Sequence, residues 1–401
     1  MMLPGLLCYK RIGNLKTEPM KSVRIFFFAL AACAGASCIQ DEALNSEAAI
    51  DAVTGANIQL ANIDAANKRI NIYVPRQNAY AQQELIFTLA DEAAIAATPA
   101  YASDDVAANL YDFSGGDTRR FTVTSEDGTW KTVYDITLVN TELPLEYSFD
   151  DLLEGSSAAY DIFVEEQNIL GEDNSRVLQW VSGNPGYELT GMAKSRTDYP
   201  TVQVAEGHTG RCVKLETRET GSFGMSINPR MPIAAGNIFV GSFDLSYALT
   251  DARAATKFGF PFYQQPERLQ GYYKFRAGDV FTDANGDVVA DRRDKCDIYA
   301  VLYEVDSNTD FLDGDNSLTS PDIVLMARIP QEEIVEGDEW IYFDEPFEKP
   351  EGGSKTFDAA GLEEGRYKLA IVCSSSVRGA YFEGAVGSTL YVDDLRLICR
   401  P

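Results

Sequence analysis

Histidine is nearly absent from this sequence, since His208 is the single histidine in 401 residues. A zinc site of the H-E-x-x-H type needs two histidines and is therefore excluded, and a Ser-His-Asp arrangement could use only His208. His208 lies in the glycine-bracketed segment EGHTG (206–210), which favours a solvated turn over a catalytic base. A Walker loop and a strand-linked G-x-G-x-x-G are also missing, so no nucleotide-binding motif is present.

Basic residues are few as well. The sequence has 34 Lys and Arg against 61 Asp and Glu, which gives a net charge of −27. A surface this negative repels phosphate backbones and anionic lipid headgroups, so we expect no nucleic-acid partner. Neutral ligands, cations and sugars remain possible partners.

Cysteines are sparse and widely spaced. Beyond the first forty residues only Cys212, Cys296, Cys373 and Cys399 occur, and no C-x-x-C is present, which argues against a zinc site. Cys296 and Cys373 lie in apolar runs that read as strands, where we expect small buried side chains. Whether any of the four pair in a disulfide stays open, because a chain of this length does not need one.

The residues that are abundant indicate a β protein. The sequence has 20 Tyr, 21 Phe and 31 Gly, and stretches with helical periodicity are scarce. Single hydrophobic cores stop growing at roughly 250 residues, so 401 residues predict two or three domains.

The first 37 residues have the layout expected of a signal peptide. Lys21 and Arg24 precede the apolar run 25–32, and small residues follow it. The run is too short for a membrane-spanning helix of about 20 residues. Because residues 1–19 fit no part of a signal, we expect translation to start at Met20, with 1–37 forming an upstream segment and a lipoprotein signal peptide.

Two cysteines could carry a lipid. The sequence LAAC ends at Cys33 and matches the lipobox pattern closely, but cleavage there leaves a signal of only 13 residues from Met20. Cleavage before Cys38 leaves 18 residues, so we predict lipidation at Cys38, with Cys33 as the alternative. The acidic residues after Cys38 resemble the surface-export signal of Bacteroidales lipoproteins. We therefore expect a lipid anchor in the outer membrane, on the cell surface, followed by a tether over residues 38–55.

Residues 56–143 predict an immunoglobulin-like β-sandwich. The segment 69–74 (RINIYV) alternates, 85–89 is a second strand, and 121–124 and 132–139 flank an Asp-Gly turn typical of hairpins. In the last strand Tyr134, Ile136 and Leu138 share one face. The Ala-rich residues 91–108 read as a short helix or a loop. No site chemistry is visible here, so we interpret this domain as a spacer.

Residues 146–401 predict a β jelly roll. The segments 297–305 (DIYAVLYEV) and 367–373 (YKLAIVC) are apolar on both faces, which indicates central strands. The segment 271–276 alternates, with Tyr273 and Phe275 on one face. A propeller is disfavoured because no repeat of 40–50 residues occurs.

Several motifs in this region resemble one family, PCMD, the "putative carbohydrate metabolism domain" of surface lipoproteins in gut Bacteroidales. They are FVGSFDL (239–245), KFGFPF (257–262), LQGYYKFRAGDVFTD (269–283), CDIYAVLYEVD (296–306), LTSPDIVLMARI (318–329) and FEGAVGSTLYVDDLRL (382–397). The resemblance implies a galactose-binding-like jelly roll and a role in handling glycans, with the preceding sandwich as the usual partner domain.

Neutral sugars stack on aromatic rings, and polar side chains form hydrogen bonds with their hydroxyl groups. Three stretches combine both kinds of residue at expected loops: 179–184 (QWVSGN), 262–268 (FYQQPER) and 374–383 (SSSVRGAYFE). From these we predict a ligand site formed by Tyr263, Gln265, Arg268 and Tyr381, with Trp180 as a further candidate. No cofactor is expected.

Acidic residues raise two further possibilities. In the last strand the apolar positions change parity between Val392 and Leu395, so we predict a β-bulge at Asp393 and Asp394 and, as a weaker hypothesis, a structural Ca²⁺ there. A second acidic segment at 283–287 favours a hairpin turn over a calcium loop.

Glycoside hydrolysis needs only a carboxylate pair, which the sequence can neither exclude nor locate. We therefore predict a glycan-binding surface lipoprotein that accompanies other glycan-utilisation proteins. A carbohydrate-active hydrolase or esterase and a non-catalytic adhesin or scaffold remain as alternatives.

Overall fold

The computed structural model describes residues 47–400, except 66, 75–79, 91, 117, 141, 155, 157, 167–175 and 306–308. The described residues belong to one compact unit, Asn45–Pro401. The expected signal peptide, Cys33, Cys38 and residues 38–46 of the expected tether lie outside the described residues. Among the residues that are described, no helix has both the length and the apolar character needed to cross a membrane.

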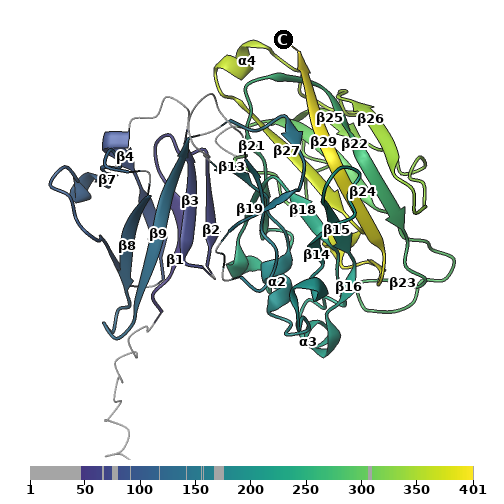
Figure 1. The fold of residues 1–401 in the computed structure, drawn as a ribbon, viewed down its shortest axis with the longest axis horizontal. Helices are drawn as coiled ribbons and strands as arrows, with labels where there is room; N and C mark the ends of the chain where they lie inside the picture. The colour runs from purple at the N-terminus through teal and green to yellow at the C-terminus, as the bar shows by residue number, and fades with distance from the viewer. Residues whose placement is uncertain are drawn as a thin grey trace, which may run out of the picture. The chain divides into compact units, whose positions relative to one another are not determined.

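The first part of the structure is a β-sandwich, as the alternating strands predicted (Figure 1). Its elements are β1 (Ile50–Thr54), β2 (Leu60–Asp64), β3 (Arg69–Val74), η1 (Tyr80–Gln82), β4 (Gln83–Glu84), β5 (Ile86–Leu89), β6 (Ala94–Ala97), η2 (Val106–Ala108), β7 (Leu110–Tyr111), β8 (Thr118–Thr124) and β9 (Lys131–Asn140). The larger sheet has the order β2-β3-β9-β8-β6, with β3 and β9 parallel, and the pairs β1-β5 and β4-β7 accompany it.

The predicted periodicity of this sandwich is confirmed. Tyr134, Ile136 and Leu138 of β9 are all buried in one core with side chains of β1, β3 and β8. The predicted hairpin joins β8 to β9 through a turn in which Gly128 has a positive φ of 70°. Because alternate residues of a strand point to opposite faces, this spacing alone fixed which side of β9 is buried.

The interpretation of residues 91–108 as one short helix or loop is partly wrong. Ala94–Ala97 form strand β6, which pairs antiparallel with β8. Alanine favours helices in isolation, but the edge of β8 offers backbone hydrogen bonds, and this tertiary pairing outweighs the local preference. Val106–Ala108 do form one 3₁₀ turn.

The second part is the β jelly roll. Its elements are β10 (Glu146–Tyr147), β11 (Asp151–Leu152), β12 (Phe163–Glu166), β13 (Arg176–Gln179), α2 (Asn184–Glu188), η3 (Arg196–Asp198), β14 (Thr201–Val204), β15 (Cys212–Glu216), β16 (Arg218–Glu219), α3 (Gly221–Ser226), β17 (Ile233–Ala234), β18 (Asn237–Phe239), β19 (Gly241–Phe243), η4 (Leu245–Tyr247), β20 (Thr256–Phe258), β21 (Phe260–Pro261), β22 (Gln265–Arg276), β23 (Phe281–Thr282), β24 (Asp297–Glu304), β25 (Ile323–Arg328), β26 (Ile341–Pro346), α4 (Ala360–Glu363), β27 (Tyr367–Ser374), η5 (Gly379–Tyr381), β28 (Gly384–Ala385) and β29 (Thr389–Arg400).

Two antiparallel sheets dominate this domain. The first, here termed the β22 sheet, has the order β14-β15-β29-β22-β26, and β10 also pairs with β29. The second, the β24 sheet, has the order β18-β27-β24-β25, with β21 also paired to β27. Figure 1 shows β22, β29 and β26 running side by side. The strands β22 and β29 are paired along their whole length, from Gln265 opposite Arg400 to Arg276 opposite Thr389.

The strands β24 and β27 are central and buried on both faces, as their continuous apolar sequences predicted. One face packs against the β22 sheet, where Ile298 and Ile371 share a core with Phe275 and Leu390. The opposite face, which carries Tyr299, is covered by a second apolar cluster supplied largely by loops and short strands. This covering creates the cavity described below.

A buried carboxylate fastens the segment that follows β27. Asp294 accepts hydrogen bonds from Ser376 Oγ (2.6 Å), Ser388 Oγ (2.7 Å) and the Ala385 backbone N–H (2.8 Å), and its side chain is sealed from solvent. Burial raises the pKa of Asp294, and the donors oppose this shift. The predicted turn at 283–287 is present, closed by backbone bonds from the Asp283 N–H to the Asp287 carbonyl and from the Gly286 N–H to the Asp283 carbonyl.

Replacing Asp294 tests its structural role. We expect Asp294→Ala to lower the free energy of unfolding by about 3 kcal/mol, because it leaves several buried donors without an acceptor. Asp287→Ala, at an exposed position of the adjacent turn, should change it by less than about 0.5 kcal/mol. Urea unfolding of both variants measures the difference, and equal stabilities would contradict the role assigned to Asp294.

Candidate functional site

A cavity of about 400 Å³ lies over the covered face of the β24 sheet. Tyr299, Arg328 and Val372 from β24, β25 and β27 line one side of it, and the segments around α3 and η4 contribute Phe223 and Arg253. Ligand sites typically have volumes of about 300–1,000 Å³ and combine an apolar lining with a few polar groups. This cavity therefore has the size and the composition of a small-molecule site.

The polar groups of the cavity form ordered pairs. Arg328 holds Asp297 through two parallel bonds of 2.8 Å, from Nε to Oδ1 and from Nη2 to Oδ2. Burial raises the pKa of Asp297, and the charge and hydrogen bonds of Arg328 oppose that shift. The Tyr299 and Ser317 hydroxyls lie 2.8 Å apart. These side chains are already held in fixed positions, so a polar ligand would bind them with little loss of side-chain entropy.

Tyr381, one of the ligand residues predicted from the sequence, lines this cavity. Two guanidinium groups lie close to its ring, with the Arg378 carbon 4.2 Å and the Arg253 carbon 5.2 Å from the ring centroid. Arg253 in turn lies 2.5 Å from Asp315, and Arg378 lies 3.1 Å from Glu383. The partly buried ring is thereby held in position beside charged groups that can bond to hydroxyls.

Most of the predicted stretch 374–383 lines this cavity. The chain leaves β27 at Ser374 and turns through η5, where Phe382 adopts a left-handed φ of 58°. Bonds from Ser376 to Asp294 and from the Val377 N–H to the Lys295 carbonyl hold the turn. The stretch therefore lies at the cavity, and its role in ligand binding stays a prediction.

The structure does not bring the other predicted ligand residues to the same place. Tyr263 is 40% exposed, and its hydroxyl accepts a hydrogen bond from Gln59 Nε2 (2.7 Å). Gln265 and Arg268 lie on β22, where Arg268 pairs with Asp344 at 2.5 Å. None of these residues lines the cavity beside Tyr381.

Trp180 occupies the core rather than a surface. Its side chain is only 2% exposed, it contacts the rings of Tyr147 and Phe149, and its Nε1–H donates to Glu165 at 3.1 Å. Burial raises the pKa of Glu165 to about 7. The sequence pattern could not distinguish this position from a loop-end ring, because β13 ends at Gln179 and the indole points inward.

Several residues of the cavity were not predicted. Phe223 and Met231 come from the α3 region, and Arg253 and Arg328 come from segments far from residue 381 in the sequence. Their convergence depends on how loops cover the β24 sheet, and no local pattern carries that information. The one local signal of a polar group at this place is Arg328, which ends the otherwise apolar strand β25.

The predicted β-bulge in the last strand is confirmed. Between β22 and β29 the register shifts between Gln270 and Tyr272, so that Asp394 and Leu395 lie opposite the single residue Gly271. Asp394 has a positive φ of 47°, which turns its side chain away from the regular alternation. As a result Val392 and Leu395 both face the core although they have opposite parity.

The two aspartates of the bulge contact the 206–210 turn. Asp393, fully buried, accepts bonds from the Thr209 N–H (3.0 Å) and the Asp394 N–H (2.8 Å). Oδ2 of Asp394 lies 2.7 Å from Nδ1 of His208 and 2.8 Å from Oγ1 of Thr209. His208 is therefore a turn residue, as predicted, and it is anchored by Asp394.

The carboxylates of the bulge already accept hydrogen bonds from the 206–210 turn. Ca²⁺ takes six to eight oxygen ligands, and both carboxylates are already occupied by donors from the turn. Across the described part of the chain, no group of three or more His, Cys, Asp or Glu side chains could hold a metal ion. The Ca²⁺ at Asp393 or Asp394 stays a hypothesis from sequence.

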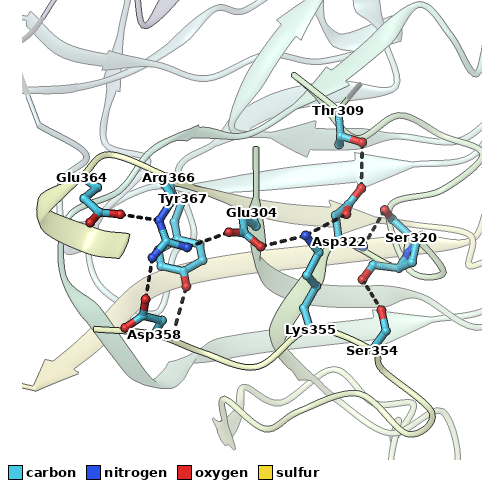
Figure 2. A network of polar contacts seen from close by, with 11 residues as sticks. Glu304, Thr309, Ser320, Asp322, Ser354, Lys355, Asp358, Glu364, Arg366 and Tyr367 are labelled. Atoms are coloured by element: carbon cyan, nitrogen blue, oxygen red, sulfur yellow. Dashed lines mark hydrogen bonds and ion pairs between the residues drawn. The ribbon is translucent and has the colours of Figure 1, made fainter. Parts of the chain in front are cut away.

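At the far end of β24, acidic side chains are neutralised in an ion-pair network (Figure 2). Arg366 contacts Glu304, Asp358 and Glu364 at 2.6–2.7 Å, and Lys355 joins Glu304 to Asp322. The hydrogen bond from Lys355 is the main cause that lowers the pKa of Glu304. A lowered pKa makes Glu304 poorly suited to act as the protonated partner of a hydrolytic pair.

The fold and the cavity define an all-β protein with a ligand-sized site in its jelly roll. The chain belongs to the family described as "Putative carbohydrate metabolism domain" (PCMD), whose model matches residues 148–398, as the motifs predicted.

Two solved structures from Bacteroides are similar over most of their length. One, described as a "putative glycoside hydrolase" from Bacteroides thetaiotaomicron, is 42% identical, covers 90% of this chain and 99% of that chain, and has a TM-score of 0.76. Another with the same description, from Bacteroides vulgatus, is 40% identical, covers 64% of this chain and 98% of that chain, and has a TM-score of 0.57.

More distant matches add little. A carbohydrate-binding module solved with β-1,4-galactotriose shares 10% identity over 50% of this chain and 83% of that chain, with a TM-score of 0.23. The comparison with curated proteins finds no match. Together with the family, the neighbours make this a carbohydrate-related domain.

The buried Asp393 predicts a pH effect on stability. Burial raises its pKa from 3.8 to about 6, so its proton is bound more tightly in the folded state. Its contribution is complete below about pH 3.8 and is lost as the pH rises through about 6. We expect the unfolding free energy of the wild type to fall relative to that of Asp393→Asn between about pH 4 and pH 6.

Chemical denaturation at a series of pH values measures this difference. The exposed Asp287→Asn serves as the control and should follow the wild-type curve. Parallel curves for the wild type and Asp393→Asn would show that this carboxyl group does not titrate as its surroundings require.

Proposed function

We propose that this protein is a glycan-binding lipoprotein of the cell surface, anchored in the outer membrane through Cys38, and that it holds a sugar in the cavity beside Tyr381. The observation that carries the proposal is the cavity itself, of about 400 Å³, in which an aromatic ring flanked by Arg253 and Arg378 lies near the Asp297–Arg328 pair. Rings bind the C–H faces of sugars, and fixed charged groups bind their hydroxyls.

Membership of the PCMD family supports a carbohydrate ligand. The net charge of −27 is compatible with a neutral glycan and opposes nucleic acid. In this proposal the N-terminal sandwich is a spacer, the anchor keeps the jelly roll at the membrane surface, and other glycan-utilisation proteins receive the captured sugar.

Substitution of Tyr381 tests the cavity. We expect Tyr381→Ala to weaken binding of a glycan found on an array by about tenfold, since loss of a stacked ring removes roughly 1.4 kcal/mol. Tyr263→Ala is the matched control, because this tyrosine is also partly exposed but lies outside the cavity. Calorimetry decides the outcome, and weaker binding by Tyr263→Ala alone would place the sugar elsewhere.

A hydrolase is the second candidate. Two acids, Asp297 and Asp315, line the cavity, burial raises the pKa of Asp297, and the 42% identical protein is described as a "putative glycoside hydrolase". Both acids are paired with arginine, which favours binding over catalysis. A panel of chromogenic glycosides separates the two functions, because a binding protein releases no chromophore.

The anchor is tested by two cysteine variants. We expect Cys38→Ala to abolish labelling of the protein by an alkyne fatty acid in cells and to remove it from the outer-membrane fraction, whereas Cys33→Ala retains both. Loss of labelling in Cys33→Ala with retention in Cys38→Ala would assign the lipid to Cys33 instead.

A further inference from the structure

The outer face of the β22 sheet carries a cluster of aromatic rings. Tyr272 of β22 lies directly opposite Tyr342 of β26, with ring centroids 5.3 Å apart, and Tyr342 is 52% exposed. Tyr391 of β29 lies opposite Lys274, and Trp340 directly precedes β26. These four rings, Tyr272, Trp340, Tyr342 and Tyr391, are termed the aromatic cluster. They come from the sheet opposite the one that bears the cavity.

The rings are held in place by contacts that leave them on the surface. The imidazole of His208 stacks on Tyr272, with a centroid distance of 3.6 Å and an interplanar angle of 12°, and meets Trp340 edge-on at 6.1 Å. Asp394 fixes the imidazole from the bulge. The Lys274 ammonium lies 4.5 Å from the Trp340 centroid and 4.7 Å from that of Tyr391. Rings ordered before binding lose little entropy when a ligand stacks on them.

Polar groups continue the same face along β22. Gln270 and Arg268 both bond to Asp344, at 3.0 Å and 2.5 Å. Outward side chains of a strand follow one another at about 6.6–6.8 Å, so Arg268, Gln270, Tyr272 and Lys274 span roughly 20 Å. The charge of Arg268 is paired with that of Asp344, and the Lys274 ammonium lies over the Trp340 and Tyr391 rings.

We propose that this face is a second carbohydrate-binding surface, which takes an extended neutral glycan chain. Rings stack on successive sugar units, while the amide and guanidinium groups of Gln270 and Arg268 bond to hydroxyls. A flat face cannot enclose one sugar, so affinity must accumulate over several units and rise with chain length. Because Arg268 is already paired with Asp344 and Lys274 is engaged by two rings, a non-ionic polymer fits this face better than a charged protein partner does.

This proposal does not depend on ligand binding in the cavity, since the two sites lie on different sheets. It also gives a role to the bulge and to the single histidine. Asp394 of the bulge holds His208, and His208 positions the ring of Tyr272.

The test is affinity electrophoresis of the full protein in gels containing soluble galactan, arabinan, xylan, β-glucan or galactomannan, with size-matched oligosaccharides of two and six units in calorimetry. We expect at least one polymer to retard the wild type and the six-unit chain to bind at least tenfold more tightly than the two-unit chain. Trp340→Ala/Tyr342→Ala should lose the retardation, whereas Tyr381→Ala should keep it.

Trp130→Ala is the matched control, because Trp130 is an exposed tryptophan of the N-terminal sandwich and should behave like the wild type. Thermal melting of all variants shows that they remain folded. No retardation of the wild type by any of the polymers, or equal retardation of Trp340→Ala/Tyr342→Ala and Trp130→Ala, would overturn the proposal. Loss of retardation in Tyr381→Ala alone would assign the polymer to the cavity and would also overturn it.

Discussion

The β24 sheet buries both of its faces, and the rest of the jelly roll follows from this constraint. Its inner face packs against the β22 sheet in the larger core. Its outer face is apolar as well, so loops and short strands must cover it to keep Tyr299, Val301 and Val372 from water. A cover made of loops packs less regularly than a second sheet, and the cavity beside Tyr381 lies beneath it.

The β22 sheet has the opposite character. Its strands alternate, so that Leu269, Tyr273 and Phe275 enter the core while Arg268, Tyr272 and Lys274 stay outside. One sheet therefore bears the cavity and the other an open aromatic face. In the functions proposed here, the cavity binds a sugar and the open face binds an extended glycan. Both surfaces bind neutral glycans in these proposals, and a neutral ligand is not repelled by a chain with a net charge of −27.

Local pattern was sufficient to predict the features that depend on strand periodicity. The buried face of β9 and the bulge at Asp394 follow from parity along a single segment. The two-sided burial of β24 and β27 follows from their continuous apolar runs. The motifs of residues 239–397 were sufficient for the family. The helix-or-loop interpretation failed at Ala94–Ala97, where pairing with β8 decides the conformation.

The residues that line the cavity were predicted less completely, because they are far apart in the sequence. Tyr381 lines the cavity, but Arg253 and Arg328 reach it only through the tertiary fold. Trp180 has the local signature of a loop-end ring and is nevertheless buried against Phe149. The most direct measurement is a crystal structure of the protein soaked with a glycan that binds it. Sugar density against the Tyr381 ring, within hydrogen-bonding distance of Arg253 or Arg378, is expected. An empty cavity in crystals that hold the sugar only elsewhere would contradict the account.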